Sequence, residues 1–197
     1  FGGSSVESAS AIERVAGIVR QRLERKPIVV VSAMGKTTNK LLAIADAAVK
    51  GERQKALDLT VDLQDFHLRE ATRAVREEDR AELELFLNNH FQELKELTRG
   101  LAVLGELTPR SIDAISSYGE RLSSYIVTLA FRYHGIATEH VDSRKVVVTD
   151  NRHTAAAPLF EETYARMAAQ VAPVAAHSVV VMGGFIGSTE AGVTSTL

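Results

Sequence analysis

Apolar residues recur every three or four positions over much of the chain, most clearly from 83 to 104, where polar residues fill the positions of the opposite helix face. This spacing is typical of amphipathic helices. We expect a first helix from about Ser4 to Lys26, started by Ser-x-x-Glu capping patterns, and a second after a cap at Thr38 or Asn39. The segment 53–135 is predicted to be helical, with a break near Gly100 to Pro109.

Short, continuous apolar runs separate the helical segments. Ile28–Val31 and Val179–Met182 are rich in β-branched residues, as in strands buried on both faces of a parallel sheet. Ala137–Val141 predicts another strand and Val146–Thr149 a weaker one, with a helix from about Leu159 to Val171. This order predicts an α/β sheet that carries a helical insertion over about residues 53–118.

Charge and composition narrow the class of protein. The 197 residues include 23 Lys+Arg and 25 Asp+Glu, dispersed along the chain, so neither a nucleic-acid partner nor an anionic membrane surface is expected. The chain has no cysteine, which excludes disulfides, thiolate metal ligands and cysteine nucleophiles. The apolar runs are far shorter than the ~20 residues of a membrane span. The histidines lack metal-ligand spacing, so we expect no metal ion held by imidazole.

The first candidate loops lie at the start of the chain and after the strand 28–31. In open α/β sheets, ligands bind at the carboxyl ends of the strands. Gly2 and Gly3, before a helix, suit an anion, although an ordinary tight turn explains them as well. Residues 32–39 contain Gly-Lys-Thr-Thr but are not a P-loop, because Val30 stands where that motif needs its first glycine. They predict a site for a small polar ligand, or else only a turn and a cap.

Two further candidates lie at Gly119-Glu120 and at 182–188. Glu120 stands among largely apolar neighbours and could hold an ammonium group; alternatively, it is solvated and paired with Arg121 or another basic residue. The segment 182–188 has three glycines directly after a strand and predicts a second anion-binding loop on the same side of the sheet.

Together, these segments resemble the aspartokinases. The resemblance rests on residues 1–6, 29–42, 117–124, 141–144 and 183–188, in the family's order. It implies the amino acid kinase fold, a three-layer αβα sandwich with a mainly parallel sheet. It also implies transfer of the γ-phosphoryl group of MgATP to the side-chain carboxylate of L-aspartate, giving 4-phospho-L-aspartate, the first step of lysine, threonine and methionine biosynthesis. The long helical segment resembles the monofunctional, lysine-sensitive branch, although enzymes fused to homoserine dehydrogenase share the motifs.

The resemblance assigns roles residue by residue. It implies that the ATP phosphates contact Phe1, Gly2, Gly3, Ser4 (in place of the usual threonine), Gly183, Gly184 and Gly187. It implies that aspartate contacts Ser32, Thr38 and Glu120. The chain itself is expected to supply no metal ligand, since Mg²⁺ would bind through the nucleotide phosphates.

Two family elements are missing from this sequence. The family has a lysine directly before the position of Phe1, and a Gly-Arg-Gly-Gly-Ser-Asp motif after the position of Leu197. We therefore expect residues 1–197 to be the amino-terminal portion of a kinase domain, without the ATP-binding half and the ACT regulatory domains, and inactive alone. The full-length enzyme is expected to be a cytoplasmic homo-oligomer, a dimer. The alternatives are an acetylglutamate, glutamate or uridylate kinase of the same superfamily, and a non-catalytic binding or assembly module.

Overall fold

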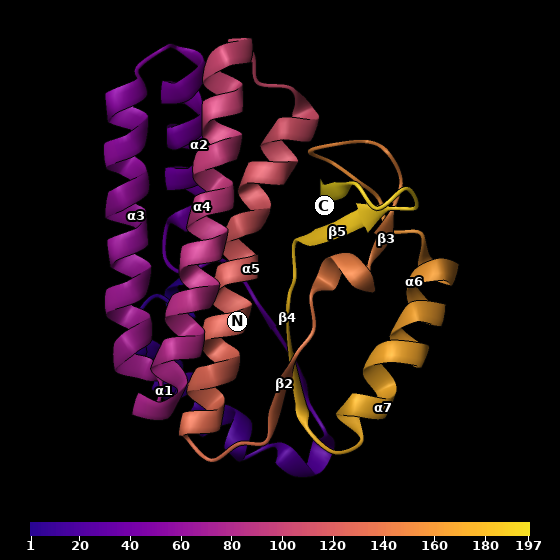
Figure 1. The fold of residues 1–197 in the computed structure, drawn as a ribbon. Helices are drawn as coiled ribbons and strands as arrows, with labels where there is room; N and C mark the ends of the chain where they lie inside the picture. Colours follow the sequence, from indigo (N-terminus) through magenta and orange to yellow (C-terminus); the bar gives the residue numbers. More distant parts are fainter.

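The computed structural model describes residues 1–197 as a sheet between two unequal helical layers (Figure 1). The helices are α1 (Ala9–Arg20), α2 (Thr37–Val49), α3 (Arg53–Ala74), α4 (Arg80–Leu104), α5 (Pro109–Tyr133), α6 (Phe160–Arg166) and α7 (Ala172–Ala175), with a π-helical turn at Met167–Val171. The strands are β1 (Ile28–Val31), β2 (Thr138–His140), β3 (Val148–Thr149), β4 (Val179–Gly183), β5 (Ile186–Thr189) and β6 (Thr194–Thr196). The expected α/β class is confirmed.

The central sheet has the strand order β1-β4-β2, and both pairs are parallel. Every residue of β4 is buried, as the apolar run at 179–182 predicts, whereas β1 lies at the edge of the sheet and exposes Ile28 and Val30, so the expectation that β1 is buried on both faces was wrong. Val179 and Val181 belong to the large core beneath the helical block. Val180 and Met182 face a smaller core completed by Val171. The alternation places one helical layer on each face of this strand, which gives the three layers implied by the resemblance.

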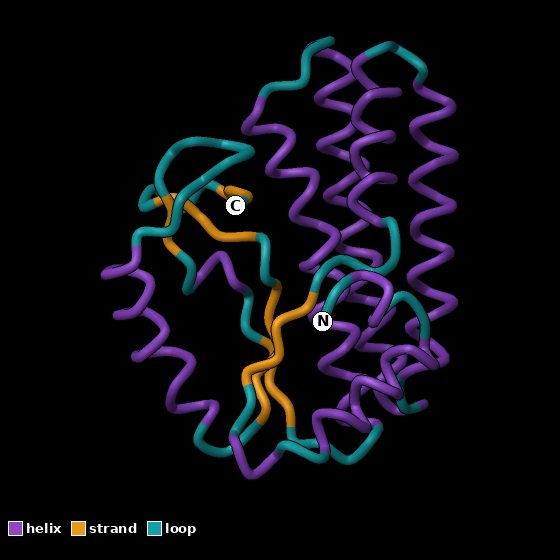
Figure 2. The backbone as a smooth tube through the Cα atoms, turned by 180° about the vertical axis from the view of Figure 1, so that it is seen from behind, coloured by secondary structure: helices purple, strands orange, loops and turns teal.

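The larger layer is a block of long helices, in which α3 and α4 form a hairpin and α5 packs against both the block and the sheet (Figures 1 and 2). Its core is built from the apolar positions that recur at helical spacing, such as Leu83, Leu87, Phe91 and Leu94, all at most 1% exposed. The segment 53–118 is thus helical, apart from short connections, as expected.

A second small sheet, β3-β5-β6, was not predicted. Its strands β3 and β5 are parallel, and β5 and β6 are antiparallel. The segment 182–188 was expected to be one loop, whereas only Gly184 and Phe185 lie between strands and Gly187 belongs to β5. Strands β5 and β6 are only four and three residues long and rich in Ser, Thr and Gly, so they lack an apolar signal. Strand β3 has two residues and lies within the predicted strand Val146–Thr149.

Both predicted limits of the first helix were wrong, whereas the break expected near Gly100 to Pro109 is confirmed. The first helix begins at Ala9 and ends at Arg20; Ser8 caps it by accepting a hydrogen bond from the Ala11 N–H (3.2 Å). Helix α4 continues through Gly100 to Leu104 and stops at Gly105, whose φ of 69° favours glycine. The start of α1 and the end of α4 each depend on the backbone conformation of one residue, Ser8 and Gly105. The spacing of apolar residues does not reveal that conformation. No helix is long and apolar enough to cross a membrane.

Candidate active site

The segments with candidate chemistry converge at the carboxyl end of β1. The Ser32 N–H donates to the Phe1 carbonyl (3.0 Å), and the Gly35 N–H donates to the Gly3 carbonyl (2.9 Å). Residues 1–3 therefore lie along the end of β1 and the turn that follows it; Figure 2 shows the amino terminus beside that strand. The strands β1 and β4 are parallel, so the glycines after β4 come to the same end of the sheet, as predicted.

Gly3 is needed because two backbones approach closely. A Cβ on Gly3 would lie 2.7 Å from the Gly35 oxygen and 2.8 Å from the Ala33 oxygen, whereas nothing lies within 4 Å of one on Gly2. The Gly2 N–H also donates to no other group of the protein. Gly3 is thus a packing position, and Gly2 leaves its backbone open to a ligand.

We expect Gly3→Ala to lower stability by about 1–3 kcal/mol, because the neighbouring carbonyl oxygens cannot move away as a flexible side chain could. Gly2→Ala, at φ −75°, is the matched control and should leave the melting temperature unchanged. Thermal unfolding of the two variants tests this. Equal melting temperatures for Gly3→Ala and the wild type would contradict the close approach.

The turn after β1 is held against α5. A Cβ on Gly119 would lie 2.7 Å from the Ala33 Cβ and 3.5 Å from the Thr38 Oγ1. The absence of a side chain at this position of α5 therefore allows the turn after β1 to pack directly against the helix. The Ser123 hydroxyl donates to the Ser32 carbonyl (2.8 Å) from the same helix. Helix α2 starts at Thr37 with no side-chain cap, so the expectation of a cap at Thr38 or Asn39 was wrong. The half-buried Thr38 therefore lies beside Gly119 without a capping role.

Glu120 is the most unusual side chain of this region. It is only 4% exposed and forms no ion pair, since its neighbour Arg121 pairs with Glu93 instead (3.1 Å). This excludes the alternative of a Glu120–Arg121 pair. The Phe185 N–H donates to the Glu120 Oε2 (2.7 Å). Burial raises the pKa of Glu120 to about 7, although backbone N–H groups of the 184–186 segment oppose the shift.

The glycines at the end of β4 and beyond it have packing partners. A Cβ on Gly183 would lie 2.7 Å from the Glu120 Oε2, and one on Gly184 would lie 2.7 Å from the Val30 Cγ1. The Gly184 N–H donates to the Val31 carbonyl (3.3 Å). At Gly187, a Cβ would lie 2.8 Å from the Val147 oxygen. These glycines bring the chain close to Glu120, β1 and residue 147; their contact with phosphate stays a prediction.

The segment 142–144 supports this turn from behind. The Ser143 hydroxyl donates to the Gly183 carbonyl (2.7 Å), and the Ser188 hydroxyl donates to the Arg144 carbonyl (2.7 Å). Arg144 is itself held by Asp142, with a nitrogen to oxygen distance of 2.6 Å. This segment belongs to the resemblance described above, which implies no role for it. Its hydroxyl and carbonyl groups fix the position of the turn beneath Glu120.

Asp113, at the start of α5, was missed altogether. It is fully buried and accepts hydrogen bonds from the His153 Nδ1 (2.6 Å), the Thr154 N–H (3.0 Å) and the Thr196 hydroxyl. Thr154 has a φ of 70°, a conformation that non-glycine residues rarely adopt without support. Asp113 thus ties α5 to the 150–154 loop and to β6. The only signal in the sequence is an acidic residue between apolar helix positions.

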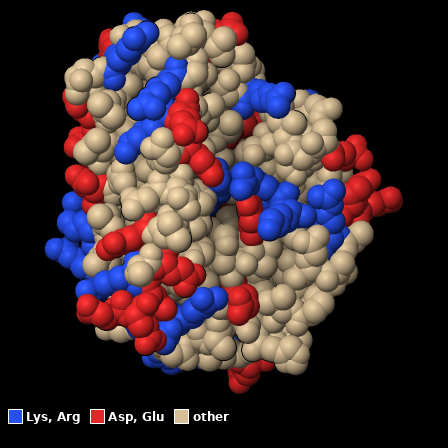
Figure 3. Space-filling view, viewed as in Figure 1, with Lys and Arg blue, Asp and Glu red and all other residues tan.

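A polar cleft of about 290 Å³ lies between α4, α5 and the 142–145 segment. Figure 3 shows Lys and Arg side chains gathered at the centre of this face, where the helical block meets the sheet. Arg121 and Arg144 line the cleft, but Glu93 and Asp142 neutralise them. His140 hydrogen-bonds to the Ser124 hydroxyl (2.9 Å), and burial lowers its pKa to about 4. Lys145 also lines the cleft and forms no ion pair, so the cleft keeps one unpaired cation, whereas Glu120 is an unpaired carboxylate.

Comparison with known proteins identifies relatives of this arrangement. The model of the amino acid kinase family matches residues 1–196. The chain is 31% identical to lysine-sensitive aspartokinase 3 of Escherichia coli over 202 residues, which cover all of this chain and 42% of that protein. It is 30% identical to the chloroplastic aspartokinase 1 of Arabidopsis thaliana over 203 residues, covering 100% of this chain and 34% of that one.

The solved structures agree with this relationship. The crystal structure of E. coli aspartokinase III in complex with aspartate and ADP superposes with a TM-score of 0.83 at 31% identity, again covering 100% of this chain and 42% of that one. The complex of the same enzyme with lysine and aspartate gives a TM-score of 0.85. The chain thus spans less than half the length of these relatives.

Proposed function

The chain belongs to the amino acid kinase family, and we propose that it forms the amino-terminal part of the kinase domain of an aspartate kinase. The observation that carries this proposal is Glu120, a buried carboxylate with no cationic partner at the ligand-binding end of the sheet. A buried charge needs a partner, and the ammonium group of an amino acid substrate would supply it. The related E. coli enzyme was crystallised with aspartate and ADP, which agrees with this choice of substrate.

The reaction transfers a phosphoryl group between two anions, so it requires neutralisation and alignment of charge rather than a base. The side-chain carboxylate of aspartate is already ionised at neutral pH. In this proposal Glu120 receives the ammonium group of the substrate, while Ser32 and Thr38 direct its carboxylates. The amides of Gly2, Gly3 and Ser4 would face the nucleotide phosphates, with Gly183, Gly184 and Gly187 as the floor below them; the Phe1 nitrogen instead donates to the Val30 carbonyl (2.7 Å).

The residues present fit a nucleotide but form no metal site of their own. Gly2 has an N–H without an acceptor and open space around its Cα, as close approach by a phosphate requires. No three His, Asp or Glu side chains are grouped to hold a metal ion. Mg²⁺ therefore belongs to the proposal as the partner of ATP, where it would neutralise phosphate charge.

The direct experiment is an ADP-release assay on the full-length protein that contains these residues. We expect release to depend on L-aspartate, and the acyl phosphate product to be trapped by hydroxylamine as the hydroxamate. The alternatives are tested by replacing aspartate with N-acetylglutamate, glutamate or uridine monophosphate. Turnover with one of these and none with aspartate would replace the proposed substrate. Absence of turnover with all of them would favour a non-catalytic module.

Other parts of the proposal extend the family relationship. A role in lysine, threonine and methionine biosynthesis would follow from the product. Three further predictions are that residues 1–197 alone are inactive, that the full-length enzyme is a dimer and that it is cytoplasmic. The last one is open because relatives include chloroplastic enzymes.

We expect Thr38→Val to raise the aspartate KM about tenfold, because a hydrogen bond to a charged group contributes roughly 1.5–3 kcal/mol. The melting temperature should change little, since Thr38 does not cap α2. Thr37→Val is the matched control: the Thr37 hydroxyl donates to the Met34 carbonyl (2.6 Å), so its loss should lower stability and spare KM. A Thr38→Val enzyme with normal KM would remove Thr38 from the substrate site.

A further inference from the structure

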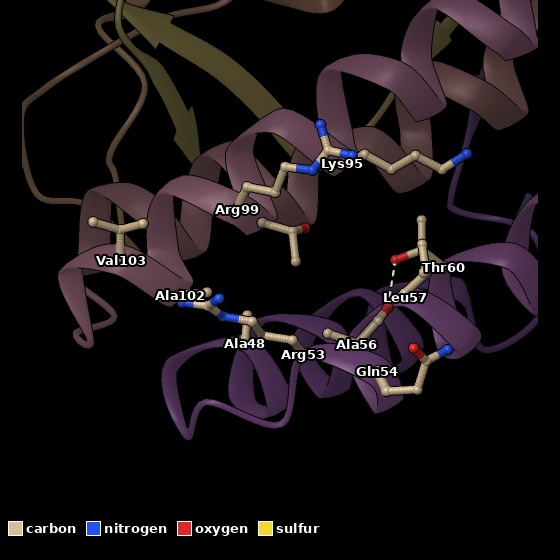
Figure 4. A pocket seen from close by; sticks show the side chains of 11 residues that line it. Ala48, Arg53, Gln54, Ala56, Leu57, Thr60, Lys95, Arg99, Ala102 and Val103 are labelled. Atoms are coloured by element: carbon tan, nitrogen blue, oxygen red, sulfur yellow. Dashed lines mark hydrogen bonds between the residues drawn. The ribbon is translucent and has the colours of Figure 1, made fainter.

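A groove of about 440 Å³ lies between the amino-terminal end of α3 and the carboxyl-terminal end of α4, closed at one side by the last turn of α2. Figure 4 shows Lys95, Arg99 and Val103 on the α4 wall, opposite Arg53 and Leu57 on the α3 wall. The volume is within the ~300–1,000 Å³ of typical small-molecule sites. None of its lining residues belongs to the segments that converge on Glu120.

Five of the eleven residues that line the groove are apolar. Ala48, Ala56 and Ala102 leave space that larger side chains would fill. The hydroxyl groups of Thr60 and Thr98 are not available to a ligand as donors, because each donates to a carbonyl of its own helix (2.7 Å in both). Leu57 and Val103 are 45% and 80% exposed. An occupant of the groove would therefore need an apolar body.

The charged side chains of the groove are all cations. Arg53, Lys95 and Arg99 line it, and no Asp or Glu does. None of the three forms an ion pair, although the neighbours Lys50 and Lys55 are paired with Asp46 and Glu52. Lys95 contacts only a neutral group, the Gln64 side-chain oxygen (3.0 Å). In a chain of net charge −2, this unneutralised group of cations attracts an anion.

We propose that this groove binds a small amphiphilic anion, with an apolar body between α3 and α4 and a carboxylate or phosphate head on Arg53 and Arg99. The site is separate from the proposed catalytic site. Helix α2 carries Thr38 in its first turn and Ala48 near its end, and its 13 residues span about 20 Å. The proposal rests on the groove alone and not on the proposed function.

The test is displacement of 8-anilinonaphthalene-1-sulfonate, followed by fluorescence, from the full-length protein. Octanoate and octyl phosphate are compared to distinguish a carboxylate from a phosphate head group. The compound that displaces the fluorescent probe at the lower concentration carries the preferred head group. Octylammonium is the control for the octyl chain without a negative charge, and inorganic phosphate is the control for the negative charge without an apolar body. We expect both octyl anions to displace the probe at concentrations at least tenfold lower than either control.

Variants locate the binding. Arg53→Gln/Arg99→Gln should weaken octanoate displacement at least tenfold, whereas Arg22→Gln/Arg25→Gln, which removes two exposed cations elsewhere, should not change it. Ala102→Leu fills the groove without a change of charge and should also weaken displacement, so the test does not depend on one variant. Equal displacement by octylammonium, or unchanged displacement in both groove variants, would overturn the proposal. So would concentration-dependent dimerisation that the double variant abolishes, because a second copy would then occupy the groove.

Discussion

Glu120→Gln in the full-length protein is expected to raise the aspartate KM about a hundredfold, with the KM for ATP unchanged. Glutamine keeps an oxygen that can accept the Phe185 N–H, so the 184–186 segment stays in place. What the variant loses is the negative charge opposite the substrate's ammonium group. Removing one member of a buried charge pair costs about 3–5 kcal/mol. The lower figure corresponds to roughly a hundredfold in affinity.

The control is Glu161→Gln, the same change of charge at an exposed position on α6. It should leave both KM values unchanged. Initial rates against aspartate at saturating ATP, with circular dichroism to verify folding, complete the measurement. A folded Glu120→Gln enzyme with the wild-type aspartate KM would show that this carboxylate does not touch the substrate.

Asp113→Ala is expected to lower the free energy of unfolding by about 3–5 kcal/mol, the largest effect on stability that we predict. The alanine removes a fully buried acceptor from the donors of His153, Thr154 and Thr196, and the Thr196 hydroxyl among them is itself buried. The loss also releases Thr154 from the contact that stabilises its positive φ. Denaturant unfolding curves measure the effect.

Asp62→Ala, at an exposed position of α3, is the matched control and should change stability by less than about 0.5 kcal/mol. Asp113→Asn should be intermediate, because an amide keeps one acceptor oxygen but loses the charge. If Asp113→Ala were as stable as the wild type, the hydrogen bonds of this side chain between α5 and β6 would contribute nothing to the free energy of unfolding.

The parallel sheet was predictable because two of its three strands, β1 and β4, carry continuous β-branched runs. Ile28–Val31 and Val179–Met182 match β1 and all but the last residue of β4. Parallel pairing then brings their carboxyl ends together, which is why the candidate loops could be placed at one site. The helical block was predictable for a similar reason, since its core residues repeat at helical spacing.

The contacts that depend on sequence-distant residues could not be predicted. The N–H groups near Gly183 suggested an anion site, whereas the Phe185 N–H donates to Glu120, 65 positions earlier in the chain. Likewise, Asp113 has its partners 40 or more positions away, and nothing in its neighbourhood indicates them. The strands β5 and β6 pair through backbone groups, which leave no trace in side-chain hydropathy.

The most direct test of the account is the pH dependence of the aspartate KM in the wild type and in Glu120→Gln. Because burial raises the pKa of Glu120 to about 7, the carboxylate is ionised above that pH and takes up a proton below it. The substrate's ammonium group stays charged throughout, so only the ionised carboxylate can pair with it. We expect the wild-type KM to approach a tenfold rise per pH unit below about 6, and the variant's KM to stay high and flat. A wild-type KM that does not change between pH 5.5 and 8 would contradict the assignment of Glu120 to the substrate.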